Sequence, residues 1–388
     1  MRLNTHKTHC MKIGIVCYPT FGGSGVVATE LGLELSKRGH EIHFITYNQP
    51  VRLELLSNNV HYHEVTVPEY PLFHYQPYEL ALSSKLVNMV KLHGIEILHV
   101  HYAIPHAYAA YMAKKMLKEE GIHLPIVTTL HGTDITLVGS HPFYKPAVTF
   151  SINKSDAVTT VSKSLKEDTL RLFDIKKDIS VVPNFIDLEK YNHGFTDCQR
   201  AIMANDEEKI ITHISNLRPV KRVQDVISVF YNIQKEMPAK LMFIGEGPEK
   251  EKVELRCQEL GISDKVVFFG RSNEIDKILC FTDLFLLPSE TESFGLVALE
   301  SMASGVPVIS SNSGGLPEVN IHGKSGFLSP VGDVEDMTKN ALYLLSDETR
   351  LKTFKDNARA EALKFDLHAI VPQYEAIYED TLAKCLVL

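Results

Sequence analysis

Two glutamates, Glu292 and Glu300, are the residues of this chain whose type and spacing most directly suggest chemistry. They follow the apolar run Leu284–Pro288, which is typical of a buried strand. We expect a helix to begin next with Ser293 as its cap, so that the amides of residues 294–296 lack helical partners and can bind an anion. Glu300 would then lie about two turns into the helix among apolar positions, where a buried carboxylate needs a partner. A cis-diol is such a partner, because its two hydroxyls can donate to one carboxylate.

A plainer interpretation of these residues stays open at this point. Glu292 could complement the dipole of the helix N-terminus, and Glu300 could be a solvated surface acid. Arg218 and Lys221 follow the predicted strand Ile210–Ile214 and could form no more than a solvated basic turn. The residues taken alone are therefore compatible with a ligand site and with an ordinary charged surface.

Polar residues also follow three predicted strands in the first half of the chain. The strand Lys12–Pro19 leads into the glycine cluster Gly22–Gly25, whose backbone could approach an anion or a sugar closely. Two further strands end in the polar segments His99–His106 and Thr129–Asp134, at the edge where α/β proteins bind ligands. The histidines at positions 99, 101 and 106 invite a metal, but no Asp, Glu or Cys completes the set, so we expect none. His131 and Asp134 could also form a local structural pair.

The alternation of strand and helix patterns extends over the whole chain and predicts its architecture. Short apolar strands separated by helical periodicity indicate an α/β fold with parallel sheets. A polar stretch at about residues 190–209 interrupts this alternation, which then restarts. We predict two Rossmann-like, doubly wound domains that face each other across a cleft. The first spans residues 11–189, with a C-terminal helix at about residues 365–388 packed back on it, and the second spans residues 205–364.

The segment Ser289–Glu300, with Ser-Phe-Gly-Leu between its two glutamates, resembles the paired-glutamate motif of retaining GT-B glycosyltransferases of family 4. The resemblance implies that Glu292 lies near the donor sugar, that Glu300 holds the nucleotide ribose and that the amides between them meet the diphosphate. It also implies a diphosphate-binding role for Lys221. The donor-binding residues that we predict are Gly23, Asn216, Arg218, Lys221, Glu292, Phe294, Gly295, Leu296 and Glu300.

A transferase of this kind must stabilise a diphosphate that gains negative charge as the glycosidic bond breaks. Fixed cations and helix amides stabilise that transition state more than the ground state. The sequence contains no D-x-D, the motif that holds a divalent metal in transferases of the other common fold. We therefore predict that Lys221 and Arg218 neutralise the diphosphate without a metal or other cofactor. The family retains the anomeric configuration, and in front-face attack the leaving phosphate takes the acceptor proton, so no dedicated nucleophile is required.

Loops of the first half narrow the resemblance to the branch of the family that transfers N-acetylglucosamine from UDP-N-acetylglucosamine to L-malate in bacillithiol biosynthesis. The segments that carry this resemblance are Cys17–Gly25, His101–His106, Thr128–Thr136, Pro183–Asp187 and Val220–Asp225. The acceptor-binding residues that we predict are Ser24, Tyr102, Thr129 and His131. The catalytic residues that we predict are His131, Lys221 and Glu292. The sequence shows no clear arginine clamp for a dicarboxylate.

Other functions fit the sequence less well. A transferase with a lipid or polysaccharide acceptor normally carries a basic amphipathic surface on its first domain, and only a small cluster at Lys114–Lys118 would contribute here. The paired glutamates disfavour a UDP-sugar epimerase. A non-catalytic module that binds nucleotide sugars is disfavoured because Lys221, Glu292 and Glu300 are all present.

The composition restricts the partners of the protein. A net charge of −8 and a pI of about 6.1 argue against a nucleic-acid binder. The longest apolar runs have strand length, so we expect no membrane insertion. Six scattered cysteines without a C-x-x-C pair, and no signal-peptide pattern in residues 1–10, favour a cytoplasmic protein with reduced cysteines and no structural zinc. We expect small-molecule substrates as partners, and a homo-oligomer is compatible with the sequence.

Overall fold

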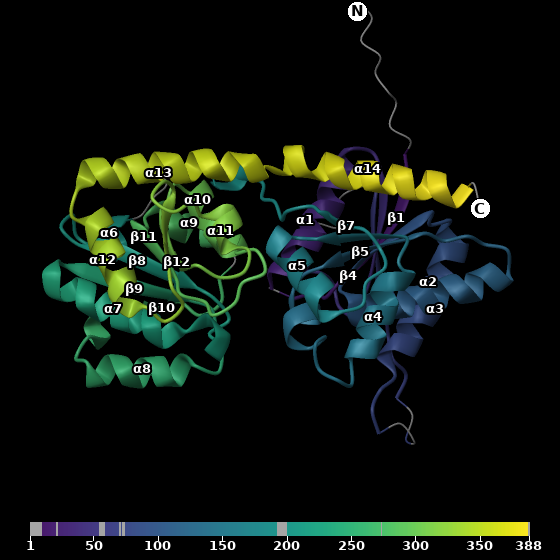
Figure 1. Cartoon of the computed structure of the whole chain (residues 1–388), viewed down its shortest axis with the longest axis horizontal. Coiled ribbons are helices and arrows are strands. Elements are labelled where there is room, and N and C mark those ends of the chain that lie inside the picture. Colours follow the sequence, from purple (N-terminus) through teal and green to yellow (C-terminus); the bar gives the residue numbers. More distant parts are fainter. Residues whose placement is uncertain are drawn as a thin grey trace, which may run out of the picture. The chain divides into compact units, whose positions relative to one another are not determined.

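The computed structural model describes residues 10–20, 22–53, 59–69, 71, 74–191, 200–272 and 274–386. The chain divides into two compact units, Met1–Pro183 with Leu367–Leu388 and Asn184–Asp366 (Figure 1). The linker predicted at about residues 190–209 falls within the second unit, and its residues 192–199 lie outside the described part. Residues 1–9 of the N-terminal leader also lie outside it.

The first unit is built on a parallel sheet of seven strands in the order β3-β2-β1-β4-β5-β6-β7. Its strands are β1 (Lys12–Val16), β2 (Glu41–Thr46), β3 (Val60–Glu64), β4 (Ile97–His101), β5 (Ile126–Leu130), β6 (Ala157–Thr160) and β7 (Ile179–Val181). Its helices are α1 (Gly23–Lys37), α2 (Tyr78–His93), α3 (Tyr108–Glu119), α4 (Lys145–Lys154) and α5 (Lys163–Leu172). The central strands β4 and β5 are buried along their whole length, because helices cover both faces of a parallel sheet.

The C-terminal helix α14 (Leu367–Leu386) belongs to the first unit, although the second unit precedes it in the chain. It packs against α1, and Tyr374 and Tyr378 are fully buried beneath it. Glu375 of this helix pairs with Arg38 at 3.2 Å and with His40 at 3.1 Å. Apolar burial, the ion pair with Arg38 and the hydrogen bond with His40 together fix α14 on the first unit.

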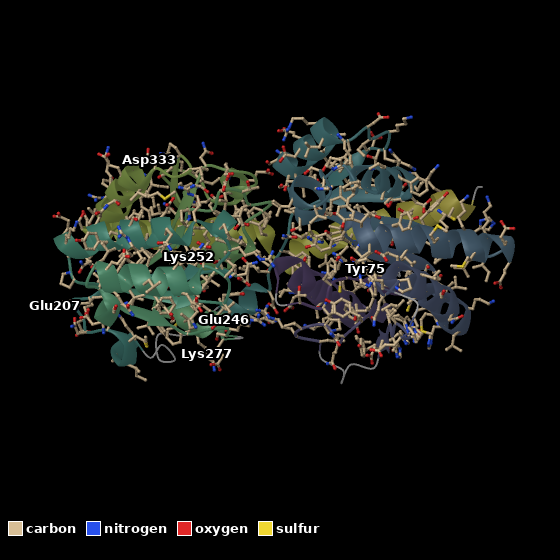
Figure 2. The ribbon with its side chains drawn as sticks, turned by 90° about the horizontal axis from the view of Figure 1, so that it is seen from below. Tyr75, Glu207, Glu246, Lys252, Lys277 and Asp333 are labelled. Atoms are coloured by element: carbon tan, nitrogen blue, oxygen red, sulfur yellow. The ribbon has the colours of Figure 1, made fainter. Side chains whose placement is uncertain are left out.

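The second unit repeats the same architecture with a parallel sheet of six strands in the order β10-β9-β8-β11-β12-β13. Its strands are β8 (Lys209–Ile214), β9 (Ala239–Ile244), β10 (Val266–Phe268), β11 (Leu284–Leu287), β12 (Val308–Ser311) and β13 (Gly326–Ser329). Its helices are α6 (Arg200–Met203), α7 (Val223–Glu236), α8 (Lys250–Glu259), α9 (Ile275–Cys280), α10 (Leu296–Ala303), α11 (Leu316–Val319), α12 (Val334–Leu345) and α13 (Glu348–Ala362). Exposed charged residues such as Glu207, Lys252 and Lys277 lie on its outside (Figure 2).

Both sheets confirm the predicted doubly wound α/β fold. In each, the strand order reverses beside the first strand of the unit, between β1 and β4 and between β8 and β11. Ligands of such sheets bind outside the carboxyl ends of the strands at this reversal. The loops that follow β1, β4, β8 and β11 are therefore the positions at which the fold places a site.

Two further features concern the class of protein. Within the described ranges, no helix combines the length and apolar character needed to cross a membrane. Cys10, Cys17, Cys257 and Cys385 are free, whereas Cys280 is disulfide-bonded. This disulfide departs from the expectation of reduced cysteines, because the fold can bring together cysteines whose spacing in the sequence gives no sign of pairing.

Candidate active site

The loop after β11 carries Glu292, which forms an ion pair with Lys221. Its Oε1 atom accepts from the Lys221 ammonium group and, at 3.0 Å, from the hydroxyl of Ser289. The two charged side chains are only 19% and 14% exposed, so solvent screens their attraction weakly. Both contacts fall on the same carboxylate oxygen, Oε1.

Neighbouring loops hold residues 289–295 in place on two sides. The amide of Glu290 donates to the carbonyl of Val220 at 2.8 Å, which ties this loop to the one that carries the lysine. On the other side, Gly314 has a φ of +58°, and a Cβ atom there would lie 1.9 Å from the carbonyl oxygen of Glu292. Only glycine therefore allows the loop before α11 to approach so closely. The ion pair is positioned by backbone contacts and not by its own side chains alone.

The start of helix α10 differs from the prediction. The helix begins at Leu296, and its N-cap is Gly295, which has a φ of 92° and makes no side-chain cap. The prediction that Ser293 caps the helix is wrong. Gly295, in the left-handed conformation, is the N-cap, so the helix begins later than a cap at Ser293 would place it. Phe294 is buried and its ring lies 5.6 Å from that of Phe365, so it anchors the loop. The first amides of the helix come directly after this buried residue in the chain.

Glu300 lies in α10 and is only 4% exposed. Its Oε1 atom accepts a hydrogen bond of 3.0 Å from the hydroxyl of Tyr191, which is also buried. This burial excludes the interpretation of Glu300 as a solvated surface acid. Tyr191 ends the short 3-10 helix Leu188–Tyr191 and was missed from the sequence, since it lies in a polar stretch that no motif marks. Its hydroxyl orients the carboxylate.

The loop after β8 carries the other predicted donor residues. Lys221 ends a short 3-10 helix, Pro219–Lys221, whereas Asn216 and Arg218 are exposed on the same loop. Arg218 forms no ion pair within the part of the chain that the structure describes. Leu217 anchors the loop, because it is fully buried despite a positive φ of 38°. The structure therefore brings Lys221 and Glu292 together and leaves Asn216 and Arg218 open to solvent beside them.

A buried histidine forms hydrogen bonds both to β11 and to the loop after β8. His213 of β8 hydrogen-bonds through Nδ1 to the carbonyl of Leu286 and through Nε2 to the hydroxyl of Ser215, both at 2.8 Å. Burial, with a smaller contribution from nearby Lys221, lowers the pKa of His213 to about 4, so its ring is neutral. The ring therefore links β8 to β11 at the strand reversal without adding charge.

In the first unit, the structure brings two of the predicted acceptor residues together. The hydroxyl of Ser24, at the start of α1, lies 2.6 Å from that of Tyr102. Tyr102 follows β4 with a φ of 83°, a conformation that is uncommon for a bulky residue. Gly23 is exposed beside them. Gly25 has a structural role instead, because a Cβ atom there would lie 2.5 Å from the carbonyl oxygen of Thr20.

The loop after β5 contains His131 and Asp134, which do not pair through their side chains. His131 Nε2 lies 2.8 Å from Nδ1 of His101, whereas the Asp134 carboxylate accepts from the amides of Ala103 and Gly132 at 2.8 and 3.1 Å. Burial lowers the pKa of His131 to about 3 and raises the pKa of Asp134 to about 6. Asp134 thus joins the loops after β4 and β5, and His131 is neutral at their surface.

Thr129 is placed differently from the expectation. It lies within β5, its side chain has no exposed surface, and its hydroxyl is 2.7 Å from both His99 Nε2 and Thr159 Oγ1. Its side chain therefore cannot reach an acceptor without rearrangement of the core. His131, one residue beyond the strand, is also buried, with 9% of its surface exposed.

Comparison with known families covers both units. Residues 21–190 match the family described as Glycosyltransferase Family 4, and residues 196–361 match the family described as Glycosyl transferases group 1. The N-acetyl-alpha-D-glucosaminyl L-malate synthase of Bacillus anthracis is 48% identical over 96% of this chain and 97% of its own. The 2-deoxystreptamine N-acetyl-D-glucosaminyltransferase of Niallia circulans is 25% identical over 74% of this chain and 77% of its own.

Solved structures show the same fold at lower sequence identity. The structure of HepE from Anabaena in complex with UDP and glucose has a TM-score of 0.81 at 20% identity and covers 95% of this chain and 99% of its own. The sucrose-phosphate synthase of Thermosynechococcus elongatus has a TM-score of 0.79 at 21% identity and covers 96% of this chain and 100% of its own. At these identities the likeness establishes the fold.

Proposed function

This chain belongs to glycosyltransferase family 4, and from that membership we propose that it transfers N-acetylglucosamine from UDP-N-acetylglucosamine to the hydroxyl of L-malate with retention of configuration. It is a glycosyltransferase of the GT-B fold. The observation that carries the choice of substrates is the 48% identity, over 96% of the chain, to an N-acetyl-alpha-D-glucosaminyl L-malate synthase. The geometry of the two units supports separate roles for their strand tips.

The second unit would hold the donor. Lys221 and the amides at the start of α10 would face the diphosphate, because a cation and helix N–H groups stabilise the charge that develops on it. Glu292 would accept a sugar hydroxyl through Oε2 while Lys221 and Ser289 hold Oε1. The leaving phosphate oxygen would take the proton of the attacking hydroxyl, so these residues bind and orient and do not act as nucleophiles.

Glu300 would hold the ribose of the nucleotide. Its carboxylate is buried in α10 and oriented by Tyr191, which favours one arrangement of its oxygens. Two ribose hydroxyls that donate to a carboxylate form charge-assisted hydrogen bonds, which are stronger than neutral ones. The exposed residues Asn216 and Arg218 would contribute further diphosphate contacts from the loop after β8.

The first unit would hold the acceptor. The paired hydroxyls of Ser24 and Tyr102 offer hydrogen bonds to the carboxylates of malate. His131 is neutral, so it can hydrogen-bond to the acceptor or the sugar without adding charge. Thr129 can contribute only through its backbone, because its side chain is buried. A short polar site of this kind suits a small acid better than a lipid.

The experiment that tests this function measures UDP release from UDP-N-acetylglucosamine with and without L-malate. We expect rapid release only when L-malate is present, and the product should be an α-glycoside identifiable by the proton coupling at its anomeric carbon. D-malate should react poorly, because inversion of that centre moves the hydroxyl away from the sugar when both carboxylates are held. Substitution Ser24→Ala should raise the KM for L-malate and leave that for the donor unchanged.

Two outcomes would separate the broad assignment from the narrow one. If L-malate does not accelerate UDP release and a lipid or oligosaccharide acceptor does, the acceptor is wrong and the retaining glycosyltransferase remains. If no acceptor releases UDP although UDP-N-acetylglucosamine binds, the protein is a nucleotide-sugar-binding module. Calorimetric titration with UDP distinguishes this second outcome from a misfolded preparation.

A further inference from the structure

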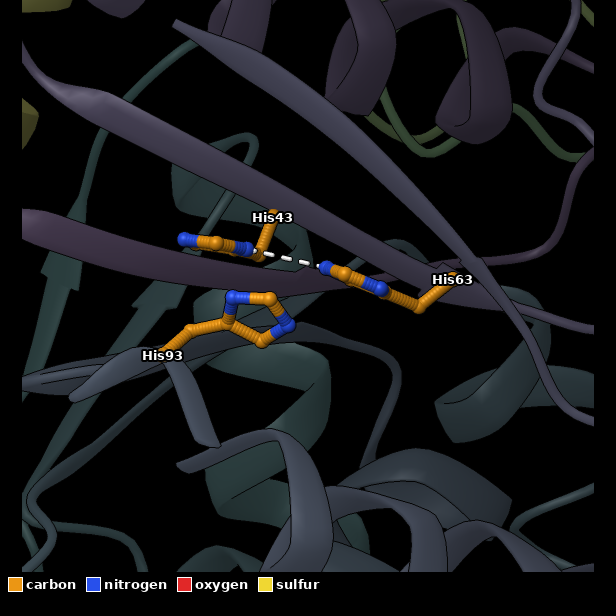
Figure 3. A group of neighbouring side chains, drawn as sticks. All are labelled: His43, His63 and His93. Atoms are coloured by element: carbon orange, nitrogen blue, oxygen red, sulfur yellow. Dashed lines mark hydrogen bonds between the residues drawn. The ribbon is translucent and has the colours of Figure 1, made fainter. Parts of the chain in front are cut away.

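A cluster of histidines occupies one edge of the first sheet, away from the strand tips that carry Tyr102 and His131. His43 lies in β2, His63 lies in the edge strand β3, and His93 ends helix α2. Figure 3 shows that the three side chains point toward one another from these three elements. No sequence pattern indicates this group, because the three positions are far apart along the chain and meet only through strand pairing and helix packing.

The ring nitrogens of this histidine cluster lie close enough together to bind a single ion. Nδ1 of His43 and Nε2 of His63 are 2.9 Å apart. The ring of His93 lies 4.8 Å from that of His43 and 4.7 Å from that of His63, and one ring nitrogen of each residue lies within 4.8 Å of the others. Nitrogen ligands at 2.0–2.1 Å from a tetrahedral zinc ion are about 3.4 Å apart, so shifts of roughly 1 Å would suffice.

A carboxylate fixes the orientation of the central histidine. Oε1 of Glu41 lies 3.1 Å from Nε2 of His43, and Oε2 of Glu41 pairs with Lys12 at 3.3 Å. Because the Glu41 carboxylate is paired with the ammonium group of Lys12, it accepts a hydrogen bond from His43. His43 must therefore donate through Nε2, which leaves the lone pair of Nδ1 directed at the other two histidines. Metal-bound histidines have this arrangement, with a carboxylate on the nitrogen remote from the metal.

The cluster is also accessible. His43 is fully buried, whereas His63 and His93 are partly exposed, so an ion could enter from the solvent side. His61 stacks on His43 at 4.8 Å, but its ring lies 6.5 Å from that of His63 and 6.4 Å from that of His93, so it stays outside the group.

We propose that His43, His63 and His93 bind a transition-metal ion of the zinc type, with Glu41 as the supporting carboxylate. Imidazole nitrogens suit zinc, copper, nickel and cobalt, and a set without sulfur or a second carboxylate disfavours calcium and magnesium. Water completes the coordination. The ion joins β2, β3 and α2, so it stabilises the edge of the first unit and takes no part in sugar transfer.

The test uses the full-length protein stripped of metal by a chelator and then freed of the chelator. Titration with Zn²⁺ against a chromophoric competitor should give one tight equivalent per chain, and Zn²⁺ should raise the melting temperature. Titration with Co²⁺ should give the visible absorption of a four-coordinate site without thiolate bands. The substitution His63→Gln removes one of the three nitrogen ligands, so it should lower Zn²⁺ affinity at least about 10-fold.

Three further variants keep the test independent of folding. Glu41→Gln retains all three nitrogen ligands but changes the group that orients His43, so Zn²⁺ affinity should fall about 10- to 100-fold. His123→Gln alters an exposed histidine of the same unit and should change nothing. The double substitution His6→Gln with His9→Gln removes two histidines near the N-terminus and should leave the tight equivalent in place.

Three outcomes would overturn the proposal. The wild-type protein could fail to compete for Zn²⁺ at micromolar concentration, in which case hydrogen bonds alone explain the cluster. The tight equivalent could persist in His63→Gln or disappear in the double variant, which would place the ligands elsewhere. Thiolate bands in the Co²⁺ spectrum would identify Cys10 or Cys385 as ligands, since both are free. UDP release by each variant, measured without added Zn²⁺, reports whether its fold is intact.

Discussion

The carboxyl ends of the two sheets have the same topology and opposite chemistry. In the second unit, the strand reversal carries a Lys221–Glu292 ion pair and a helix start, with one neutral histidine beneath them. In the first unit, the corresponding edge carries a hydroxyl pair and buried histidines that are neutral. One fold therefore supplies the positions at both edges, and the side chains alone decide what each edge can bind.

This difference supports the proposal that the two edges serve different steps of one reaction. Charge develops on a diphosphate as the glycosidic bond breaks, and a fixed ammonium group and helix amides respond to that charge. The hydroxyls and neutral histidines of the first edge have no such response, and in the proposed function they would orient an acceptor. The comparison predicts that acid lowers the stability of the first unit. It also predicts that the loss of a single charged side chain in the second unit lowers turnover or UDP binding.

The largest expected effect is a loss of stability of the first unit in acid. Burial lowers the pKa of His99 and His131 to about 3 and that of His106 to about 4, and in the second unit only His213 is lowered in this way among the described histidines. The unfolded chain takes up these protons once the pH falls below about 6.5, whereas the folded chain does not. The stability present above pH 6.5 is therefore lost on acidification, by about 1.4 kcal/mol per pH unit for each such histidine.

Hydrogen exchange measured at pH 7.5 and pH 5.5, and corrected for intrinsic rates, checks this prediction. Amides of β4 and β5 should lose more protection than those of β8 and β11. Asp134 opposes the effect, because its pKa is raised to about 6 and its protonation stabilises the fold as the pH falls from 6 toward 3.8. The stability gained from Asp134 cancels the loss from about one histidine, so the first unit still loses stability overall. Equal losses in both sheets would contradict the contrast between them.

The substitution Lys221→Ala should have the next largest effect. Its loss removes the ammonium group that faces the diphosphate and leaves Glu292 without its ion partner, so turnover at saturating donor should fall about 100-fold or more. Steady-state rates of UDP release give the measurement. Lys277→Ala, which alters an exposed lysine of the same unit, serves as the control and should retain full turnover. Near-normal turnover of Lys221→Ala would reject its role in catalysis.

A smaller effect is expected for Glu300. The substitution Glu300→Ala should weaken UDP binding by roughly 1.5–3 kcal/mol, since hydrogen bonds to a charged group are lost. Tyr191→Phe keeps the carboxylate and removes only the hydroxyl that orients it, so binding should weaken by about 0.5–1.5 kcal/mol. Calorimetric titration with UDP provides both values, with Glu290→Ala as an exposed control on the preceding loop. Unchanged affinity in Glu300→Ala would leave that residue a structural role only.

The sequence predicted the fold and the charged site better than it predicted the details of either. Periodicity and turn residues identify strands and helices because each reflects local burial, so both doubly wound sheets were foreseen. Lys221 and Glu292 were foreseen because both follow strand ends that meet at one edge. Their donor and acceptor roles stay predictions.

What the sequence missed depends on contacts between distant segments. Tyr191 reaches Glu300 across more than a hundred positions, and no pattern near either residue indicates the pair. Thr129 was expected at an exposed tip, yet hydrogen bonds to His99 and Thr159 hold it in the core. Ser293 had the residue type of a helix cap, but the left-handed conformation of Gly295 starts the helix later. Each of these outcomes is decided by packing, which a single sequence does not display.

The smallest expected effect is that of metal removal on the rate of sugar transfer, which should be none. In the proposed donor site, Lys221 and the amides at the start of α10 would neutralise the diphosphate in place of a divalent ion, and the sequence contains no D-x-D to hold one. Exhaustive treatment with a chelator should therefore leave UDP release unchanged, and added Mg²⁺ or Mn²⁺ should not increase it. The same treatment should lower the melting temperature if His43, His63 and His93 hold an ion, because that ion joins three elements of the first unit. A rate that falls with chelation and returns with Mg²⁺ would place a metal at the charged edge after all, and would remove the contrast between the two edges on which the assignment of their roles rests.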